Sequence, residues 1–194
     1  MPDQHHLTLR ERRPEDLPYL WRWEHAEGDA EWKRWDAPYF HEREAPSTVT
    51  LKEFTAKALG QSPSPNSRII ALNGECIGSI SRCEEHPRGG GWWEIGVLIH
   101  DPASWGGGLG TRALEVWTDA TFRETEAHVV TLTTWSGNVR MVRAAERAGY
   151  RECGRVPQAR LWRGQRWDSV RLCALKREWE ARRQDQASRP NTPG

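Results

Sequence analysis

The chain has 194 residues, with 28 Lys and Arg against 27 Asp and Glu and a formal net charge of +1. This length suffices for one domain with its own core, and the balanced charge argues against nucleic acid or an anionic membrane as the main partner. The N-terminus lacks the apolar core of a signal peptide, and no segment approaches the ~20 apolar residues of a membrane span. We therefore expect a soluble cytoplasmic protein.

The four cysteines give no sign of a metal site or a disulfide framework. Cys76, Cys83, Cys153 and Cys173 form no C-x-x-C pair and no ligand spacing typical of zinc. We expect free thiols and no bound metal.

Charge is distributed unevenly along the chain. Residues 138–183 contain 13 Arg and Lys against 5 Asp and Glu, whereas residues 19–45 contain 4 against 7. Solvated faces explain most such asymmetries, and the alternative is that one region meets an anion and another a cation. The twelve tryptophans are typical of a core that is short of Ile and Phe.

The N-terminal third predicts one strand followed by helices. HLTLRE alternates like a strand, and RRPEDLPYLWRWEHA has a helical pattern with Pro14 near its start. GDAEWKRWDAPYF predicts a second short helix that ends before Pro38. TLKEFTAKALG predicts a third helix closed by Gly60, and QSPSPNS is typical of a surface loop.

From Arg68 onward the pattern changes to strands. RIIALNGECIGSISRCEE predicts two strands around the Asn73-Gly74 turn, and WWEIGVLIH predicts a third after the loop HPRGGG. The glycine stretch in DPASWGGGLG then leads into a helix expected from about Leu109 to Glu124.

The C-terminal part continues the alternation of strands and helices. HVVTLTTW predicts a buried strand, NVRMVRAAERAGY a helix closed by Gly149, and YRECGRV and RWDSVRLCALK two last strands. A charged short helix and a Pro/Ser/Asn tail follow. We expect one domain over residues 1–183 and a disordered tail over residues 184–194.

The glycine stretch before this helix is suited to an anion, because a helix N-terminus offers free N–H groups and glycine lets a phosphate approach. GGGLGTRA has no lysine after its last glycine, as a Walker loop needs, and no register gives the G-x-G-x-x-G of a dinucleotide fingerprint. A strand-to-helix turn without a ligand is the structural alternative.

Two motifs carry a resemblance to a known family. WGGGLGT after WWEIGVLI, followed about 30 residues later by NVRMVRAAERAGY, resembles the GNAT (Gcn5-related N-acetyltransferase) superfamily. Its acyl-CoA loop is commonly written Q/R-x-x-G-x-G/A, and here Trp105 stands at the first place with Gly108 and Gly110 in the glycine places. The Trp-Gly opening resembles the RimJ/RimL-like branch of ribosomal-protein N-terminal acetyltransferases.

The resemblance covers roughly residues 7–176 and implies the GNAT acyl-CoA N-acyltransferase fold. This is a mixed α/β architecture, with a central, mostly antiparallel sheet that splays at the cofactor site and with helices on both faces. It also implies acetyl-CoA, whose diphosphate would lie on the backbone N–H groups of the glycine loop. The pantetheine arm would pair with the strand before the loop much as an added strand does.

The implied cofactor residues follow from this arrangement. Asn138 matches a family asparagine that contacts the cofactor arm, while Arg140 and Arg143 could each reach a phosphate or be solvated helix arginines. The complete set is Val97, Leu98, Ile99, Trp105, Gly106, Gly107, Gly108, Leu109, Gly110, Thr111, Asn138 and Arg143.

For the chemistry, the resemblance implies direct attack of an amine on the thioester in a ternary complex, and no cysteine is placed for an acyl-enzyme. Many members use a carboxylate on the strand before the loop as the base, a place that Glu94 can fill; its structural alternative is a strand-end ion pair. The usual proton donors are missing, since Ala145 stands where many members have Tyr and Met141 where the RimL-like branch often has Ser. Tyr150, Ser136 and water remain as candidates.

The acceptor pocket in this family is usually built from the first two helices and the last strands. Here those helices carry Trp32, Trp35, Tyr39 and Glu24, which would suit a cationic amine unless the tryptophans are core and the acid faces solvent.

The sequence thus predicts an acetyl-CoA-dependent N-acetyltransferase acting on a primary amine of a protein N-terminus, an aminoglycoside, a polyamine or another small molecule. A catalytically weak or silent acyl-CoA-binding module is the alternative. A homodimer is common in this family.

Overall fold

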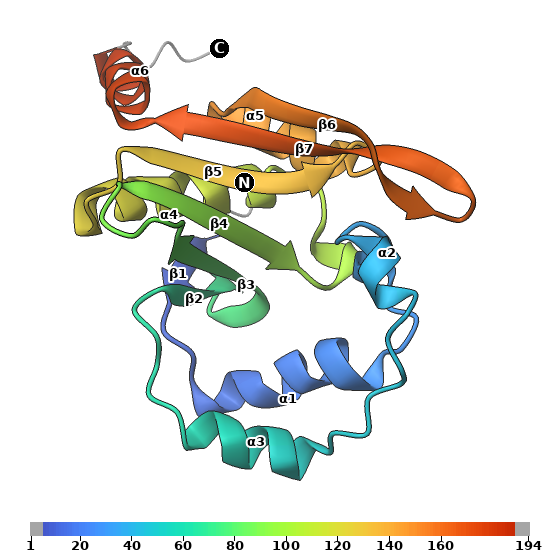
Figure 1. The fold of residues 1–194 in the computed structure, drawn as a ribbon. Helices are drawn as coiled ribbons and strands as arrows, with labels where there is room; N and C mark the ends of the chain where they lie inside the picture. Colours follow the sequence, from blue (N-terminus) through green and yellow to red (C-terminus); the bar gives the residue numbers. More distant parts are fainter. Residues whose placement is uncertain (1–5, 189–194) are drawn as a thin grey trace.

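The computed structural model describes residues 6–188 and arranges them around one seven-stranded sheet (Figure 1). The strand order is β1-β2-β3-β4-β5-β7-β6, and all neighbouring strands are antiparallel except β4 and β5. Helices lie on both faces of this sheet. The predicted mixed, mostly antiparallel α/β architecture is confirmed.

The N-terminal elements are one strand and a series of short helices. The predicted second helix is split, because Ala37 adopts a left-handed φ of 45° and Pro38 begins a new helix. The third helix starts at a capping box between Thr50 and Glu53, in which each side chain accepts the backbone N–H of the other. These elements are β1 (Leu7–Arg10), η1 (Pro14–Asp16), α1 (Leu17–Trp21), η2 (Arg22–Ala26), η3 (Glu31–Arg34), α2 (Pro38–His41) and α3 (Leu51–Leu59).

The remaining elements follow the predicted order. The β2–β3 hairpin turns at Asn73 and Gly74, which both have the positive φ of a type I′ turn. Gly149, with a φ of 111°, ends α5 as predicted. The elements are β2 (Ser67–Leu72), β3 (Glu75–Glu84), β4 (Trp92–Ile99), η4 (Pro102–Ser104), α4 (Leu109–Glu124), β5 (Val129–Trp135), α5 (Val139–Ala148), β6 (Arg151–Trp162), β7 (Gln165–Leu175) and α6 (Lys176–Ser188).

The C-terminal end corrects one prediction. Residues 184–188, expected in a disordered tail, belong to α6, which Trp179 anchors against Phe122, Tyr150 and Asp119. The rest of the predicted tail, residues 189–194, lies outside the described residues.

The main core lies between the sheet and α4, α5 and α6. Alternate residues of the strands, among them Ile95 of β4 and Leu132 of β5, point into it, and Trp117 and Leu114 of α4 fill it. A smaller cluster joins Leu20 of α1 to β2 and β3 on the opposite face. Figure 1 shows that α1 and α3 on this second face do not cover the strands β5 and β7, whereas α2 packs against the end of β5 through Tyr39 and Trp135.

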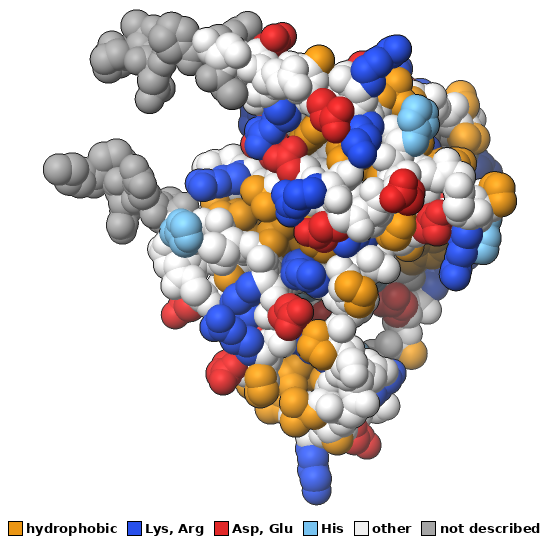
Figure 2. Space-filling model, turned by 90° about the vertical axis from the view of Figure 1, so that its left-hand side faces the viewer, with side chains coloured by type: hydrophobic (Ala, Val, Ile, Leu, Met, Phe, Trp, Pro, Cys, Tyr) orange, Lys and Arg blue, Asp and Glu red, His pale blue; other side chains and the backbone are white. Residues whose placement is uncertain are grey.

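The outer surface is mixed in charge. On the face drawn in Figure 2, Lys and Arg side chains alternate with Asp and Glu, and hydrophobic side chains gather at the lower end, where α1 and α3 lie. Among residues 6–188, no helix is long and apolar enough to cross a bilayer. This stretch also contains no group of three or more His, Cys, Asp or Glu arranged to hold a metal ion.

Candidate functional site

The sheet splays between β4 and β5. These parallel strands pair only through residues 92–94 and 129–131, so residues 95–99 of β4 pair with β3 alone. A cavity of about 610 Å³ opens where the two strands separate. Its walls come from β4, the glycine loop, the start of α4, β5, α5 and the residues 32–36.

Most of the predicted cofactor residues line this cavity. The exceptions are Gly107 and Leu109, which belong to the loop but do not reach the cavity wall. The lining members of the predicted set are Val97, Leu98, Ile99, Trp105, Gly106, Gly108, Gly110, Thr111, Asn138 and Arg143.

The glycine loop forms a backbone cradle at the N-terminus of α4. Gly106, Gly107 and Gly108 have φ values of 92°, 57° and 78°, a left-handed conformation that side chains disfavour. No other atom lies within 4 Å of the positions where their Cβ atoms would stand. Successive backbone N–H groups in such a turn, together with the free N–H groups of the helix, suit a diphosphate.

Trp105 fixes the entrance of this loop. Its indole Nε1 donates to the carbonyl oxygen of Ile99 at 2.8 Å, so this carbonyl is not free to pair with a pantetheine amide. The guanidinium of Arg140 lies 4.9 Å from the ring centre of Trp105 and 4.9 Å from that of Trp35. This stack joins the glycine loop to the opposite wall of the cavity.

Asn138 caps α5 and is hydrogen-bonded to the part of the cavity wall that Trp35 forms. Its Oδ1 accepts the backbone N–H of Met141 at 3.1 Å, and its Nδ2 donates to the carbonyl oxygen of Trp35 at 2.9 Å. Trp135 Nε1 donates to the same carbonyl at 2.8 Å. Because the side-chain NH2 group has two hydrogens, Asn138 Nδ2 can donate to a cofactor carbonyl while it keeps its bond to Trp35.

Glu94 lies beside the splay on the face of β4 that points away from α4. Its carboxylate accepts a short hydrogen bond from the Thr131 hydroxyl, and its Oε2 lies 4.0 Å from Nε of Arg171. The side chain is 18 % exposed. Although Glu94 itself does not line the cavity, the next two residues, Ile95 and Gly96, do.

The structure contradicts the two predicted proton donors. Tyr150 is 3 % exposed and its hydroxyl is hydrogen-bonded to Thr118 in the core, where burial raises its pKa further above the ordinary value. Ser136 lies at the end of β5, where its Oγ accepts the backbone N–H of Asp168. Neither residue lines the cavity. Sequence spacing alone could not show that Tyr150 faces the core.

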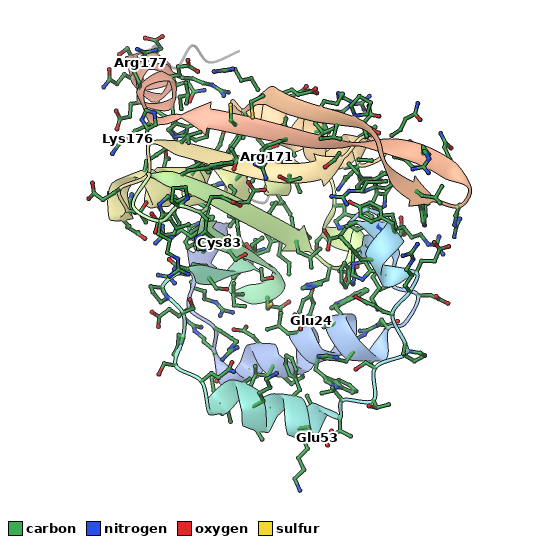
Figure 3. All side chains as sticks on the ribbon, viewed as in Figure 1. Glu24, Glu53, Cys83, Arg171, Lys176 and Arg177 are labelled. Carbon is green, nitrogen blue, oxygen red and sulfur yellow. The ribbon has the colours of Figure 1, made fainter. Side chains whose placement is uncertain are left out.

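The predicted acceptor residues are only partly brought together. Trp32 and Trp35 line the cavity, whereas Tyr39 and Glu24 do not. Glu24 lies on the helical stretch below the sheet, where desolvation raises its pKa (Figure 3). Asp36, which we did not single out, lines the cavity; the acidic excess over residues 19–45 was its only sequence signal.

Guanidinium groups of the chain itself cover several aromatic rings near this site. Arg160 lies 5.0 Å from the ring centre of Tyr39, and Arg171 lies 5.0 Å from that of Trp92. The expectation that these rings face a cationic acceptor therefore needs correction. Arg140 already stacks on Trp35, and Lys33 lies 5.7 Å from the ring centre of Trp32.

The family model described as "Acetyltransferase (GNAT) domain" matches residues 6–151. The chain belongs to the GNAT acetyltransferase family. As a member, it is an N-acetyltransferase that uses acetyl-CoA.

Individual relatives agree with this assignment. Aminoglycoside N(6')-acetyltransferase type 1 of Klebsiella pneumoniae is 27 % identical over 159 residues, which cover 77 % of this chain and 76 % of that protein. A GNAT acetyltransferase from Bacillus anthracis has a TM-score of 0.68 at 16 % identity, covering 90 % of this chain and 98 % of that one. Aminoglycoside acetyltransferase AAC(6')-Ib with coenzyme A has a TM-score of 0.63 at 22 % identity, covering 92 % and 99 %. The two solved structures show the shared GNAT fold, and the RimJ/RimL-like branch stays a prediction.

Proposed function

We propose that this GNAT enzyme acetylates the primary amine of a small-molecule acceptor by direct attack, with Glu94 as the general base. The observation that carries this proposal is the position of Glu94 at the rim of the β4–β5 splay, where its neighbours Ile95 and Gly96 form the cavity wall. The acceptor would enter over the uncovered face of the sheet, which is the face that Glu94 shares.

The cavity residues fit the cofactor. Acetyl-CoA supplies the thioester whose acetyl group is transferred. The loop of residues 106–108 and the first turn of α4 would hold the diphosphate, with Arg143 lining the same cavity. The unpaired backbone of Val97 and Leu98 would pair with the pantetheine arm, and a backbone N–H there would polarise the thioester carbonyl.

Proton transfer in this proposal depends on one carboxylate and on water. An amine must lose a proton to react, and a lysine-like amine with a pKa near ~10.4 needs a base more than an α-amine near ~8. Glu94 would take this proton. Within residues 6–188, no tyrosine or cysteine lines the cavity, so water protonates the thiolate and no acyl-enzyme forms.

The relatives make a small-molecule acceptor the first candidate. The curated relatives are named for aminoglycosides, and a solved neighbour is named for its complex with coenzyme A and kanamycin. A protein N-terminus remains the second candidate, because the Trp-Gly opening of the loop resembles that of the RimJ/RimL-like branch.

Two measurements test the proposal. Thermal unfolding with and without acetyl-CoA measures binding, and thiol release with kanamycin, a polyamine, a lysine-like amine and N-terminal peptides measures transfer. We expect stabilisation by acetyl-CoA and release that depends on a small amine. Stabilisation without release on any amine would support a silent acyl-CoA-binding module, and release only with peptides would support the second candidate.

A further inference from the structure

We infer that the acceptor carries a carboxylate in addition to its amine and that Arg171 binds this carboxylate. The inference rests on the proposed function, because it concerns the molecule whose amine is acetylated. It requires a negative charge on the acceptor, whereas the aromatic and acidic pocket predicted from the sequence suited a cationic amine alone.

Arg171 is held at a defined position on the uncovered face of the sheet. It pairs with Thr133 in the β5–β7 register, and its Nε donates to Thr133 Oγ1 at 3.0 Å. The guanidinium also lies 5.0 Å from the ring centre of Trp92, across β5 on strand β4. One hydrogen bond and one stacking contact thus fix its plane, and Figure 3 shows Arg171 at the middle of this face.

Within residues 6–188, this guanidinium forms only one long ion pair. The nearest carboxylate, that of Glu94, is 4.0 Å from Nε and takes its hydrogen bond from Thr131 instead. Over residues 6–188, the two terminal nitrogens of Arg171 donate no hydrogen bond, and the side chain is 37 % exposed. These nitrogens are the pair that binds a carboxylate in the bidentate geometry.

Arg155 on the neighbouring strand shows the opposite arrangement. It donates to both oxygens of Glu152 and to Asp168, at 2.6 to 2.8 Å, so its charge is satisfied within the chain. The chain therefore builds a closed arginine network at Arg155. At Arg171 it builds a stacked arginine whose donors remain available.

The location of Arg171 connects it to the reaction. Its partner Thr133 lines the cavity, as does Gly96, two residues after Glu94 on the same face of β4. Arg171 itself does not line the cavity, but its Nε contacts Thr133 of the cavity wall at 3.0 Å and lies 4.0 Å from the proposed base. When the amine of an acceptor reaches the thioester over this face, the rest of the acceptor molecule lies near the guanidinium of Arg171.

The surrounding charges oppose a polycation at this position. Arg140 and Arg160 also stack on aromatic rings near the cavity and have no carboxylate within 4.0 Å in the part of the chain described. The carboxylates available to the amine are Glu94 and Asp36. An acceptor with one amine and one carboxylate complements both the carboxylates and the arginines of this region. An acceptor with several amines would place positive charge beside arginines that have no carboxylate partner.

Matched acceptor pairs test this inference. Thiol release would be measured for ω-amino acids of increasing length, for their amides and for simple alkylamines, on the wild type and on Arg171→Gln, Arg171→Lys and Arg163→Gln. Arg163 is the matched control, because it also stacks on a tryptophan, Trp162, at 4.9 Å, but lies in the β6–β7 turn and forms no ion pair with Glu94.

We expect kcat/KM of the wild type to be about 10- to 100-fold higher for the best acid than for its amide, the range of one charge-assisted hydrogen-bonded pair. Arg171→Gln should remove this acid-to-amide ratio, whatever its effect on the rate with both acceptors, because Arg171 also lies 4.0 Å from Glu94. Arg171→Lys should retain part of the ratio, and Arg163→Gln should keep all of it. Added salt should lower the ratio.

The remaining outcomes distinguish a failure of this inference from a failure of the proposed function. Equal or faster turnover of the amides by the wild type, or an acid-to-amide ratio that survives Arg171→Gln, overturns the inference while the proposed function stands. Binding of acetyl-CoA without turnover of any amine overturns both. Thermal unfolding of each variant shows whether a lost ratio arises from a lost fold.

Discussion

The side-chain amide of Asn138 donates to the main-chain carbonyl of Trp35 at 2.9 Å and so joins the start of α5 to the wall of the cavity. The same asparagine caps α5 by accepting the N–H of Met141. One residue therefore fixes a helix end, a cavity wall and a place where the cofactor arm is expected.

Two substitutions separate these roles of Asn138. Asn138→Ala removes both hydrogen bonds, and we expect it to lower the free energy of unfolding by about 1–2 kcal/mol. Asn138→Ser keeps a side-chain oxygen that can cap α5 but has no amide to donate to Trp35, so it should be the more stable of the two and should bind acetyl-CoA more weakly than the wild type. Urea unfolding and calorimetric titration measure both quantities. Equal stability of the two variants would show that the cap contributes nothing.

The strain of the glycine loop gives a second prediction. Gly108→Ala places a side chain at a φ of 78° and should lower stability by about 1 kcal/mol and weaken acetyl-CoA binding several-fold. Gly164→Ala is the matched control, since its φ of 75° lies in the β6–β7 turn away from the cavity. It should show the same loss of stability with unchanged binding. Equal effects of both variants on binding would argue against a cofactor at the loop.

Glu94→Gln tests the base. Glutamine can still accept the hydroxyl of Thr131 but cannot take a proton, so kcat with a lysine-like acceptor should fall by about 10²-fold or more. The loss should shrink with an acceptor of lower amine pKa and with rising pH. Rates across a pH series measure this effect, and an unchanged rate and pH profile would exclude Glu94 as the base.

His41 predicts a pH dependence of stability near the cavity. The carboxylate of Asp36, 3.6 Å from Nε2, and that of Glu44, hydrogen-bonded to Nδ1 at 3.0 Å, raise the pKa of His41 above its ordinary value of 6.5. The contribution of protonated His41 to the free energy of unfolding is fully present below pH 6.5. It is lost as the pH rises through the raised pKa. His41→Gln should thus be less stable than the wild type at low pH, by less than about 1 kcal/mol because both acids are exposed, and equal to it at high pH. Urea unfolding at several pH values measures the difference in unfolding free energy between the wild type and His41→Gln. A difference that grows with rising pH would contradict the prediction.

The order of the elements along the chain and the cofactor cradle could be predicted because they depend on local patterns. The Asn73-Gly74 turn fixes one hairpin, and three adjacent glycines before an amphipathic helix allow the left-handed loop that the structure shows. Gly149 likewise closes its helix where the sequence indicates. These features need no knowledge of distant residues.

The acceptor side could not be predicted in the same way, because it depends on contacts between distant segments. Nothing in the sequence pairs Arg140 with Trp35 and Trp105, or places Arg171 over Trp92. The contact with Arg140 places a cation of the chain against Trp35, a ring that the resemblance assigned to a cationic acceptor. Tyr150 shows the same limit, since its burial depends on packing against Trp179.

The central claim is acetyl transfer to an amine by a chain that binds acetyl-CoA at its glycine loop. Its most direct test incubates wild type and Gly108→Ala with acetyl-CoA and the amine panel, and follows thiol release together with the mass of each amine and of the protein. We predict that one amine gains a single acetyl group, that the protein gains none, and that Gly108→Ala needs more acetyl-CoA for the same rate. Thiol release without an acetylated amine, or an acetylated cysteine on the protein, would contradict the account.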